Sequence, residues 1–212
     1  MVDLKSMSKK KKAEYIWEYY KLHIIGVLAI ILILASIIHG QITRVDYVFD
    51  LTLIGNNVDE TKKSDVEKQL TNIVIKDGEQ KKQAIIDIIP IEGSSKEDAT
   101  MSNVSTQKFI AKISVGEIDV VILDKGMAQV YAKQDMFSRL DNIRELDLSA
   151  IKNEKIEAVG SDNIKAVYAI NAVDVKIFKD IGFDTENMVI SIISSSKQKD
   201  KAVMVFKWLL NK

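Results

Sequence analysis

The feature that most constrains this chain is a long apolar stretch near its N-terminus. Residues 22–43 contain no Asp, Glu, Lys or Arg, and residues 22–38 read LHIIGVLAIILILASII. As an α-helix, residues 22–43 would extend about 33 Å, enough to cross the ~30 Å hydrocarbon core of a bilayer. Helices of soluble domains rarely stay apolar on every face for this length. The stretch therefore predicts a transmembrane helix over residues 22–43.

The flanks of this stretch predict its orientation. Lysines dominate the preceding residues, whereas the next basic residue is a lone Arg44 with Asp46 and Asp50 close behind. Because Lys-rich flanks stay in the cytoplasm, we expect residues 1–21 inside and residues 44–212 outside the cytoplasm. Aromatic rings and lysines next to the stretch are expected at the headgroup level, beside anionic lipid. The predicted interface residues are Lys9, Lys10, Lys11, Lys12, Tyr15, Trp17, Tyr19, Tyr20 and Lys21.

A cleaved signal peptide is the alternative interpretation of the same stretch. Signal peptides have an apolar region of roughly 7–15 residues, followed by a small-residue cleavage site of the A-x-A kind. Here the apolar region is longer and no such site follows it. An uncleaved signal anchor is therefore favoured, which predicts a single-pass protein of the cell membrane.

The composition excludes several kinds of chemistry. The chain has 212 residues, with 30 basic side chains, 30 acidic side chains, two His and no Cys. Without Cys there is no disulfide, thiolate metal site or Cys nucleophile, and zero net charge argues against a nucleic-acid binder. No G-x-S-x-G elbow, Gly-rich phosphate loop or acidic metal-loop spacing occurs. We therefore expect that the protein is not an enzyme, and that it has no catalytic residue, no metal and no cofactor.

The region 44–212 alternates between strand-like and helix-like patterns. Runs rich in β-branched residues predict strands over residues 45–54, 83–91, 118–123, 164–172 and 188–193. Apolar residues at helical spacing predict helices from Ser64 to before Asp77 and over residues 98–115, 127–133 and 173–181, with a final helix near the C-terminus. Residues 147–153 are expected to form one or two helical turns. The alternation predicts an α/β fold, a single three-layer lobe with a mostly parallel sheet.

Local signals refine these helices. Ser64 and Glu67 have the spacing of a capping box, Gly116 is placed to end the second helix, and one of the serines 194–196 is expected to cap the last helix. Pro90 predicts a strand end or an edge strand. The second helix is expected to turn these side chains inward: Met101, Val104, Phe109, Ile110 and Ile113.

Three segments carry a resemblance to a known family. They are KISVGEIDVVILDKGMAQVYAKQDMFSRLDNI (residues 112–143), YAINA (168–172) and ISIISSSKQKDKAVMVFKWLL (190–210). They resemble the extracytoplasmic solute-binding proteins of ABC transporters, of the type 2 periplasmic-binding-protein kind, in residue classes rather than identities. With its KKKAEYIWEYYK start, the whole chain also resembles a group of small single-pass membrane proteins. The resemblance implies a binding lobe that works beside a transporter.

The chain departs from that family in its length. A complete solute-binding protein encloses its ligand between two lobes, but the elements of one lobe consume nearly all of residues 44–212. We infer one lobe, with the second missing or reduced to residues 141–162. Small-ligand sites bury roughly 70–90% of the ligand, and one lobe offers only one wall. Tight capture of a solute would then need a second subunit. Alternatively the lobe is a scaffold or accessory subunit that contacts a membrane-protein partner.

Candidate ligand contacts lie after the predicted strands. In open α/β sheets ligands bind outside the carboxyl ends of the strands. Because Asn, Gly, Ser and Asp are also ordinary turn and cap residues, a purely structural role is the competing interpretation. Asp119, at the start of a strand, is expected to be structural. The candidate ligand-binding residues are Gly55, Asn56, Asn57, Ser94, Ser95, Asp124, Gly126 and Asn171.

Overall fold

The computed structural model describes residues 8–43, 45–56, 58–75, 81–93, 100–173 and 175–211. The chain divides into two compact units, Met1–Val45 and Asp46–Lys212. The predicted ligand contacts Asn57, Ser94 and Ser95 lie outside the described residues.

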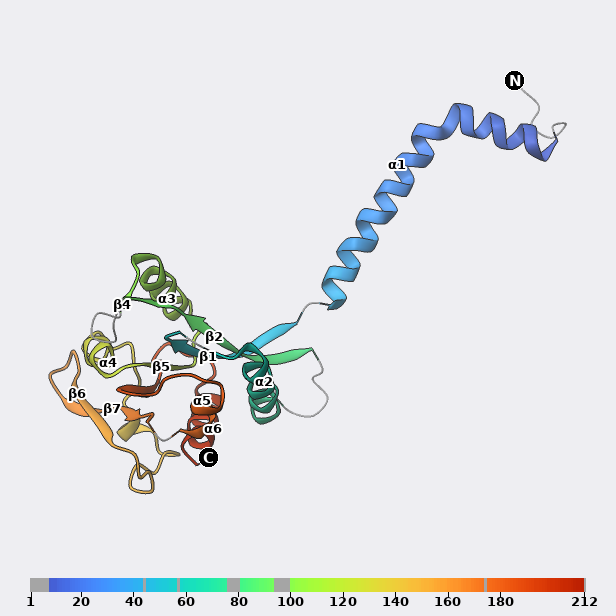
Figure 1. The fold of residues 1–212 in the computed structure, drawn as a ribbon. Helices are drawn as coiled ribbons and strands as arrows, with labels where there is room; N and C mark the ends of the chain where they lie inside the picture. The colour runs from blue at the N-terminus through green and yellow to red at the C-terminus, as the bar shows by residue number, and fades with distance from the viewer. Residues whose placement is uncertain are drawn as a thin grey trace. The chain divides into compact units, whose positions relative to one another are not determined.

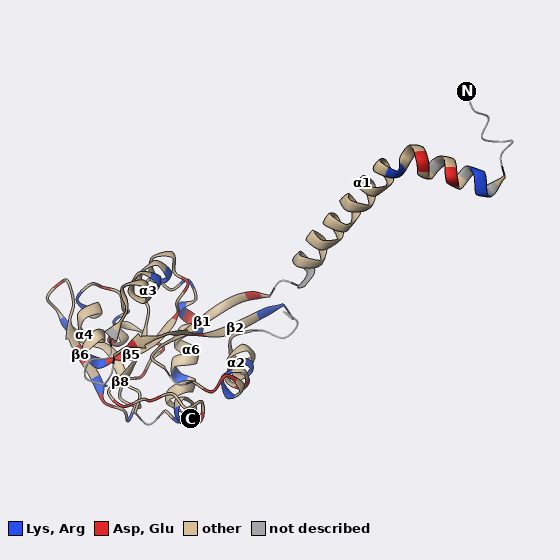
Figure 2. Ribbon diagram, turned by 45° about the horizontal axis from the view of Figure 1, so that its top comes forward, with Lys and Arg blue, Asp and Glu red and all other residues tan. Residues whose placement is uncertain are grey.

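The first unit is a single helix, α1 (Lys9–Thr43). Its segment Trp17–Gly40 is long and apolar enough, by length and composition, to cross a membrane, and none of that segment is buried inside the structure. Figure 2 shows the charged residues of α1 only in its N-terminal part, followed by a stretch without charged residues. The prediction of an apolar N-terminal helix is therefore confirmed.

The second unit is built on one six-stranded sheet with the order β2-β1-β5-β8-β7-β6. Both β2 and β5 pair parallel with β1, whereas the β5–β8, β7–β8 and β6–β7 pairs are antiparallel. The prediction of a mostly parallel sheet is wrong, because β8 returns in the reverse direction beside β5. The strands are β1 (Asp46–Ile54), β2 (Lys82–Ile89), β5 (Val120–Asp124), β6 (Lys155–Val159), β7 (Lys165–Asn171) and β8 (Met188–Ile192).

Pro90 lies between the edge strand of the main sheet and two short strands. This proline separates β2, which lies at the edge of the sheet, from β3 (Ile91–Glu92). The prediction from Pro90 is therefore confirmed. A second, two-stranded sheet pairs β3 with β4 (Thr100–Met101) in antiparallel fashion.

The strand β6 was not predicted. It lies within residues 141–162, which the sequence suggested as the remnant of a second lobe, and it pairs with β7 as a hairpin closed by a turn at Gly160–Asn163. Asn163 adopts a φ of 61°, which suits a tight turn. Residues 147–153 form turns rather than the expected helical turns, and the short 3₁₀ helix η2 (Leu140–Asn142) precedes them.

The sheet is covered on both faces, as the apolar run of residues 118–123 predicts. Side chains alternate along β5: Val120 and Ile122 join one buried cluster, and Val121 and Leu123 join the other. Helices α2 (Glu60–Val74), α5 (Lys176–Asp180) and α6 (Lys199–Leu210) contribute to the first cluster. Helices α3 (Asn103–Val115) and α4 (Lys125–Ala132) contribute to the second. Figure 1 shows the helices on the two sides of the sheet.

Two helix starts differ from the prediction. Helix α2 begins before Ser64, because the Asp59 carboxylate accepts hydrogen bonds from the backbone N–H groups of Thr61 and Lys62 at 3.0 and 3.1 Å. No serine caps α6: the N-cap residue is Gln198 and makes no side-chain cap bond, while Ser196 Oγ accepts from the Gln198 N–H at 3.0 Å. The capping signals identified the correct regions but the wrong residues.

The inward face of α3 is narrower than predicted. Phe109 and Ile113 are buried, as is Met101 in β4, but Val104 is 77% exposed and Ile110 is 40% exposed. Both exposed side chains lie on the outer side of a helix whose inner side already faces the sheet. The predicted end of α3 is confirmed, since Gly116 is its C-cap with a φ of 68°.

We expect Gly116→Ala to lower the free energy of unfolding by about 2 kcal/mol or more. A Cβ there would sit in the left-handed region and 2.6 Å from the Ser195 carbonyl oxygen. Urea unfolding of the full chain in detergent, followed by circular dichroism, measures this change. The neighbouring control Val115→Ala, at a 52% exposed position, should stay within about 0.5 kcal/mol of the wild type. Equal stabilities for the two variants would contradict the assigned backbone conformation.

Candidate functional site

The predicted contacts after β1 are engaged in local structure. Asn56 Nδ2 donates to the Ile91 carbonyl at 2.8 Å, and Asn56 Oδ1 accepts from the Ile91 N–H at 3.3 Å. A Cβ on Gly55 would lie 2.6 Å from the ring of Phe183, so the absence of a side chain permits this packing. Both residues therefore help to join the end of β1 to its neighbours.

The predicted contacts after β5 form a helix cap. Asp124 Oδ1 accepts from the N–H groups of Gly126 and Met127 at 2.7 and 3.3 Å, and so caps α4. Its second oxygen accepts from Asn187 Nδ2 at 2.5 Å. A Cβ on Gly126 would lie 2.9 Å from the Asp124 carboxylate, so glycine allows the close approach.

Asn171, at the end of β7, belongs to a second polar group at the same edge. Asn171 Nδ2 donates to Glu154 Oε2 at 3.3 Å, and Lys125 Nζ donates to Glu154 Oε1 at 2.9 Å. The hydrogen bond from Lys125 lowers the pKa of the Glu154 carboxyl. Lys125, which follows Asp124 in the chain, thus bonds to Glu154, the residue before β6.

The structure brings the ends of β5 and β7 together, and their polar side chains already bond one another. A ligand at this edge would have to compete with these bonds. The ligand-binding role of Gly55, Asn56, Asp124, Gly126 and Asn171 stays a prediction, and the geometry described here is that of caps and turns.

A partly buried ionic cluster was not predicted. Lys112 Nζ on α3 lies 2.5 Å from Asp50 Oδ2 on β1 and 3.0 Å from Asp87 Oδ2 on β2. Thr52 Oγ1 donates to Asp50 Oδ1 at 2.7 Å, and Lys108 Nζ lies 3.0 Å from Asp87 Oδ2. The cluster ties α3 to two strands. The signal in the sequence is a carboxylate in the middle of each apolar strand.

Burial and ion pairing compete within this cluster. Burial raises the pKa of the Asp50 carboxyl, and the bonds from Lys112 and Thr52 only partly oppose it. For Asp87, burial is outweighed by hydrogen bonds from Lys112 and Lys108, so that pKa is lowered. Burial disfavours the Lys112 ammonium, but its bonds to Asp50 and Asp87 raise the pKa above its usual value. The lysine therefore stays charged at neutral pH.

Asp119 extends this polar interior toward the end of β8. Its Oδ2 accepts from the Asp50 N–H at 2.9 Å and its Oδ1 accepts from Ser196 Oγ at 2.5 Å. Burial raises the pKa of the Asp119 carboxyl. Asp119 is buried, and both of its carboxylate oxygens accept hydrogen bonds. These bonds connect β1 and the segment after β8 to the start of β5, in agreement with the structural role expected for Asp119.

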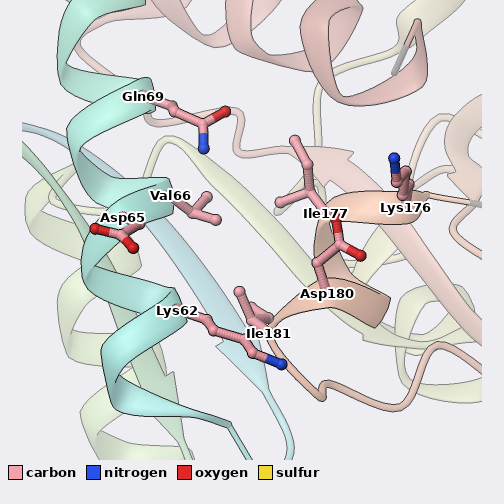
Figure 3. A pocket seen from close by; sticks show the side chains of 8 residues that line it. All are labelled: Lys62, Asp65, Val66, Gln69, Lys176, Ile177, Asp180 and Ile181. Carbon is pink, nitrogen blue, oxygen red and sulfur yellow. The ribbon is translucent and has the colours of Figure 1, made fainter.

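A surface cavity of about 280 Å³ lies between α2 and α5 (Figure 3), above the apolar side chains of Val66, Ile177 and Ile181. Its rim carries Lys62 and Asp65 from α2 and Lys176 and Asp180 from α5, with Gln69 completing the lining. Opposite charges alternate around this rim, so the cavity has no preference for one sign of charge.

Another cavity, of about 560 Å³, lies between residues 138–145, the end of β8 and the start of α6. We call it the α6 groove. It is at the opposite edge from the predicted contacts, since Met188 pairs with Asp124 but Ile192, which lines the groove, pairs with Val120. Its full lining is Ser138, Arg139, Asn142, Ile143, Arg144, Glu145, Ile192, Ser194, Lys199, Asp200 and Val203.

Among the described residues, no three His, Asp or Glu side chains lie close enough together to hold a metal ion.

Comparison with known proteins yields one structural similarity. No protein-family model matches the chain, and no curated protein matches it. An extracellular solute-binding protein family 1 from Alicyclobacillus acidocaldarius subsp. acidocaldarius DSM 446 is similar over 60% of this chain, with a TM-score of 0.36 and 14% sequence identity. The chain covers 28% of that protein. An overlap this low assigns neither a ligand nor an activity.

We expect Lys112→Met to lower the free energy of unfolding by about 3–5 kcal/mol at pH 7, because it leaves Asp50 and Asp87 without their shared cation. The control Lys108→Met removes a half-exposed partner of Asp87 and should change stability by less than about 1 kcal/mol. Urea unfolding of the full chain measures both.

The loss of stability in Lys112→Met should depend on pH. Removing Lys112 takes away an interaction that lowers the pKa of both carboxyls, so each should bind protons more tightly in the folded variant than in the folded wild type, and the variant should gain stability relative to the wild type as pH falls. Lys112 itself does not titrate between pH 4 and 7. The stability gap to the wild type should therefore narrow from pH 7 to pH 4. A gap that widens or stays constant would contradict the role of the ion pair.

Proposed function

We propose that this protein is a single-pass membrane protein whose α/β domain is a non-catalytic binding module outside the cytoplasm. In this proposal the domain is one three-layer lobe, related to type 2 periplasmic-binding-protein folds, that recognises a ligand or a partner. An ABC-type transporter is the partner that the resemblance to solute-binding proteins implies. The other proposed partner is the lipid bilayer, which would surround α1.

The observation that carries the proposal is the uncovered apolar surface of α1. Along Trp17–Gly40 no residue is buried by the described chain, and side chains such as Leu22 and Leu32 are 75% and 69% exposed. Apolar surface of this extent is unstable in water, whereas a bilayer satisfies it completely, because all backbone bonds of a helix are internal. A lipid environment is therefore the natural surrounding of α1.

The lysine-rich N-terminal part of α1 supports the proposed orientation. Lys10, Lys11 and Lys21 are exposed, and the rings of Tyr15 and Tyr19 stack at 4.6 Å near the start of the apolar segment. Lysines concentrate on the cytoplasmic side of membrane proteins and aromatic rings at the interface. Lys9 and Lys12 are also predicted for this interface, but their side chains are not among those that the structure describes.

A scaffold or accessory subunit is the second candidate function, and one observation favours it. The polar side chains at the carboxyl edge bond one another, as in the Asp124–Asn187 and Asn171–Glu154 pairs, rather than projecting free donors and acceptors. A surface of this kind suits contact with a protein better than capture of a solute. In this alternative the domain reuses a degenerate solute-binding fold for protein contact within a membrane complex.

Site-directed labelling tests the membrane topology directly, because the chain has no cysteine. We expect a membrane-impermeant maleimide to label Lys152→Cys, at an exposed position of the domain, in intact cells. Ser8→Cys should react only after the membrane is made permeable. The reverse pattern would contradict the proposed orientation, and labelling of both sites in intact cells would contradict membrane anchoring.

Thermal unfolding and affinity capture of the full chain in mild detergent separate the two functions. A binding module should gain melting temperature with amino acids, sugars, peptides or oxyanions, because a ligand present at 100 times its Kd adds about 2.7 kcal/mol. A scaffold should show no such shift and should instead co-purify with a membrane protein in fixed stoichiometry. A chain with neither a ligand shift nor a partner would contradict both.

A further inference from the structure

We propose that the free edge of β6 is an interface between two copies of this chain, in which the two β6 strands pair antiparallel and join the two sheets. This inference goes beyond the proposed function, because neither ligand recognition nor contact with another protein requires it. It rests on a difference between the two edges of the six-stranded sheet, which are β2 and β6. Figure 1 shows the hairpin of β6 and β7 at the outer margin of the second unit.

The edge at β2 is closed by side chains. Every second N–H group of β2 faces away from β1, and three of these groups in succession have a side-chain acceptor. The bonds run from Ala84 to Thr71 Oγ1 (3.0 Å), from Ile86 to Glu67 Oε1 (2.9 Å) and from Ile88 to Asp87 Oδ1 (3.0 Å). Thr71 and Glu67 belong to α2, so an incoming strand would have to displace bonds that this helix makes. Covering an edge in this way prevents pairing with other chains.

The edge at β6 has no such cover. Hydrogen bonds from the Asn171 N–H to the Glu154 carbonyl (2.9 Å) and from the Gly160 N–H to the Ile164 carbonyl (3.1 Å) bound the ladder between β6 and β7. Because backbone groups alternate sides along an antiparallel strand, the even-numbered residues of β6 face β7, and residues 155, 157 and 159 face away. Within the described part of the chain, the N–H groups of these three residues have no acceptor.

The strand β6 is itself regular enough to pair. The irregularity of the hairpin lies between Ile156 and Glu157, where β7 contains one residue more, Tyr168, so the bulge belongs to β7. The side chains on the open face are accessible, since those of Glu157 and Val159 are about half exposed. A second strand could therefore add to β6 without displacing an existing backbone bond.

Charge complementarity identifies the incoming strand as a second copy of β6. A two-fold axis at Ile156 would place Lys155 of each copy opposite Glu157 of the other, as a self-complementary interface requires. Both residues of such a pair face outward, so they exchange backbone hydrogen bonds in both directions. Two-fold axes at the neighbouring positions would instead oppose Lys155 to Lys155 or Glu157 to Glu157. Opposite charges directly across two strands stabilise the pair and like charges destabilise it, so the charges select the axis at Ile156.

The neighbouring strand extends this complementarity. Within one copy, Lys165 Nζ on β7 lies 2.5 Å from Glu157 Oε2. In the joined sheet each Glu157 would lie between its own Lys165 and Lys155 of the other copy. Lys155 Nζ donates to the Ile151 carbonyl in the single chain, so its carboxylate partner is supplied only by the second copy. Positive and negative side chains then alternate across the four strands.

Fluorescence energy transfer between copies of the full chain in lipid vesicles tests the pairing. Donor and acceptor dyes can be attached at Lys152→Cys, an exposed position close to β6 in a chain without other cysteines. We expect energy transfer that falls when unlabelled chain is added at constant acceptor density. Transfer between chains that meet only by chance would not fall.

Charge reversal tests the register. Lys155→Glu and Glu157→Lys should each weaken self-pairing by about tenfold, because like charges then face each other across the axis. An equal mixture of the two variants should recover the transfer of the wild type, since one chain then presents two acidic side chains and the other two basic ones. The control Lys207→Glu makes the same change of charge at an exposed position of α6 and should leave the transfer unchanged. Circular dichroism verifies that each variant is folded.

The proposal is overturned if unlabelled wild-type chain does not reduce the transfer, because the chain is then a monomer or pairs β6 with another protein. Equal transfer in the wild type and the two reversed variants would assign the contact to another surface, such as α1, and would also overturn it. So would a mixture of folded variants that pairs no better than either one alone. These outcomes are separate from the proposed function, since the cysteine-labelling, ligand and co-purification tests do not depend on the edge of β6.

Discussion

An apolar helix that no part of the described chain covers is the constraint on which this protein's biology depends. A soluble protein buries such a helix within its own core, but Trp17–Gly40 has none of its residues buried. The α/β unit, in contrast, buries its own apolar side chains in two clusters. The two units differ in this respect: the proposed lipid environment would cover the apolar surface of α1, whereas Asp46–Lys212 has a core of its own.

Within the α/β unit the strand β5 organises the rest. Its residues are buried on both faces, it pairs with β1 on one side and β8 on the other, and it ends at the cap of α4. The Lys112 cluster lies on the same sheet and links α3 to β1 and β2. Buried ion pairs contribute little net stability, yet they penalise wrong arrangements strongly once one partner is lost. The cluster therefore specifies where α3 sits more than it strengthens the fold.

Elements with local signals could be predicted from the sequence. The apolar run of β5, the β-branched run of β1 and the glycine that ends α3 depend on residues close together in the chain. Strand direction has no such signal: the residues of β8 would read the same in a parallel or an antiparallel position. The hairpin strand β6 was missed because its five residues include two charged side chains and only part of it is buried. Asp59 was missed as a cap because Ser64 offered a better local pattern.

The candidate sites show the same limit. Sequence reasoning placed Asp124 and Asn171 at one edge of the sheet, because strand ends can be read locally, but it could not show that Asn187 and Glu154 bond to them. The Asp50–Lys112 pair joins residues 62 positions apart. The α6 groove combines residues 138–145 with residues of β8 and α6. Such sites form only when the chain folds, so no local sequence pattern predicts them.

Spin-label accessibility along α1 tests directly whether this helix lies in lipid. Single cysteines at successive positions of Trp17–Gly40 can carry a label in the full chain reconstituted in lipid vesicles, since the chain contains no other cysteine. For a lipid-embedded helix we expect collision with oxygen to rise to a maximum near the middle of the segment, and collision with a water-soluble nickel complex to fall to a minimum there. High nickel accessibility in the middle of the segment, or low accessibility to both reagents throughout, would contradict a lipid-embedded helix.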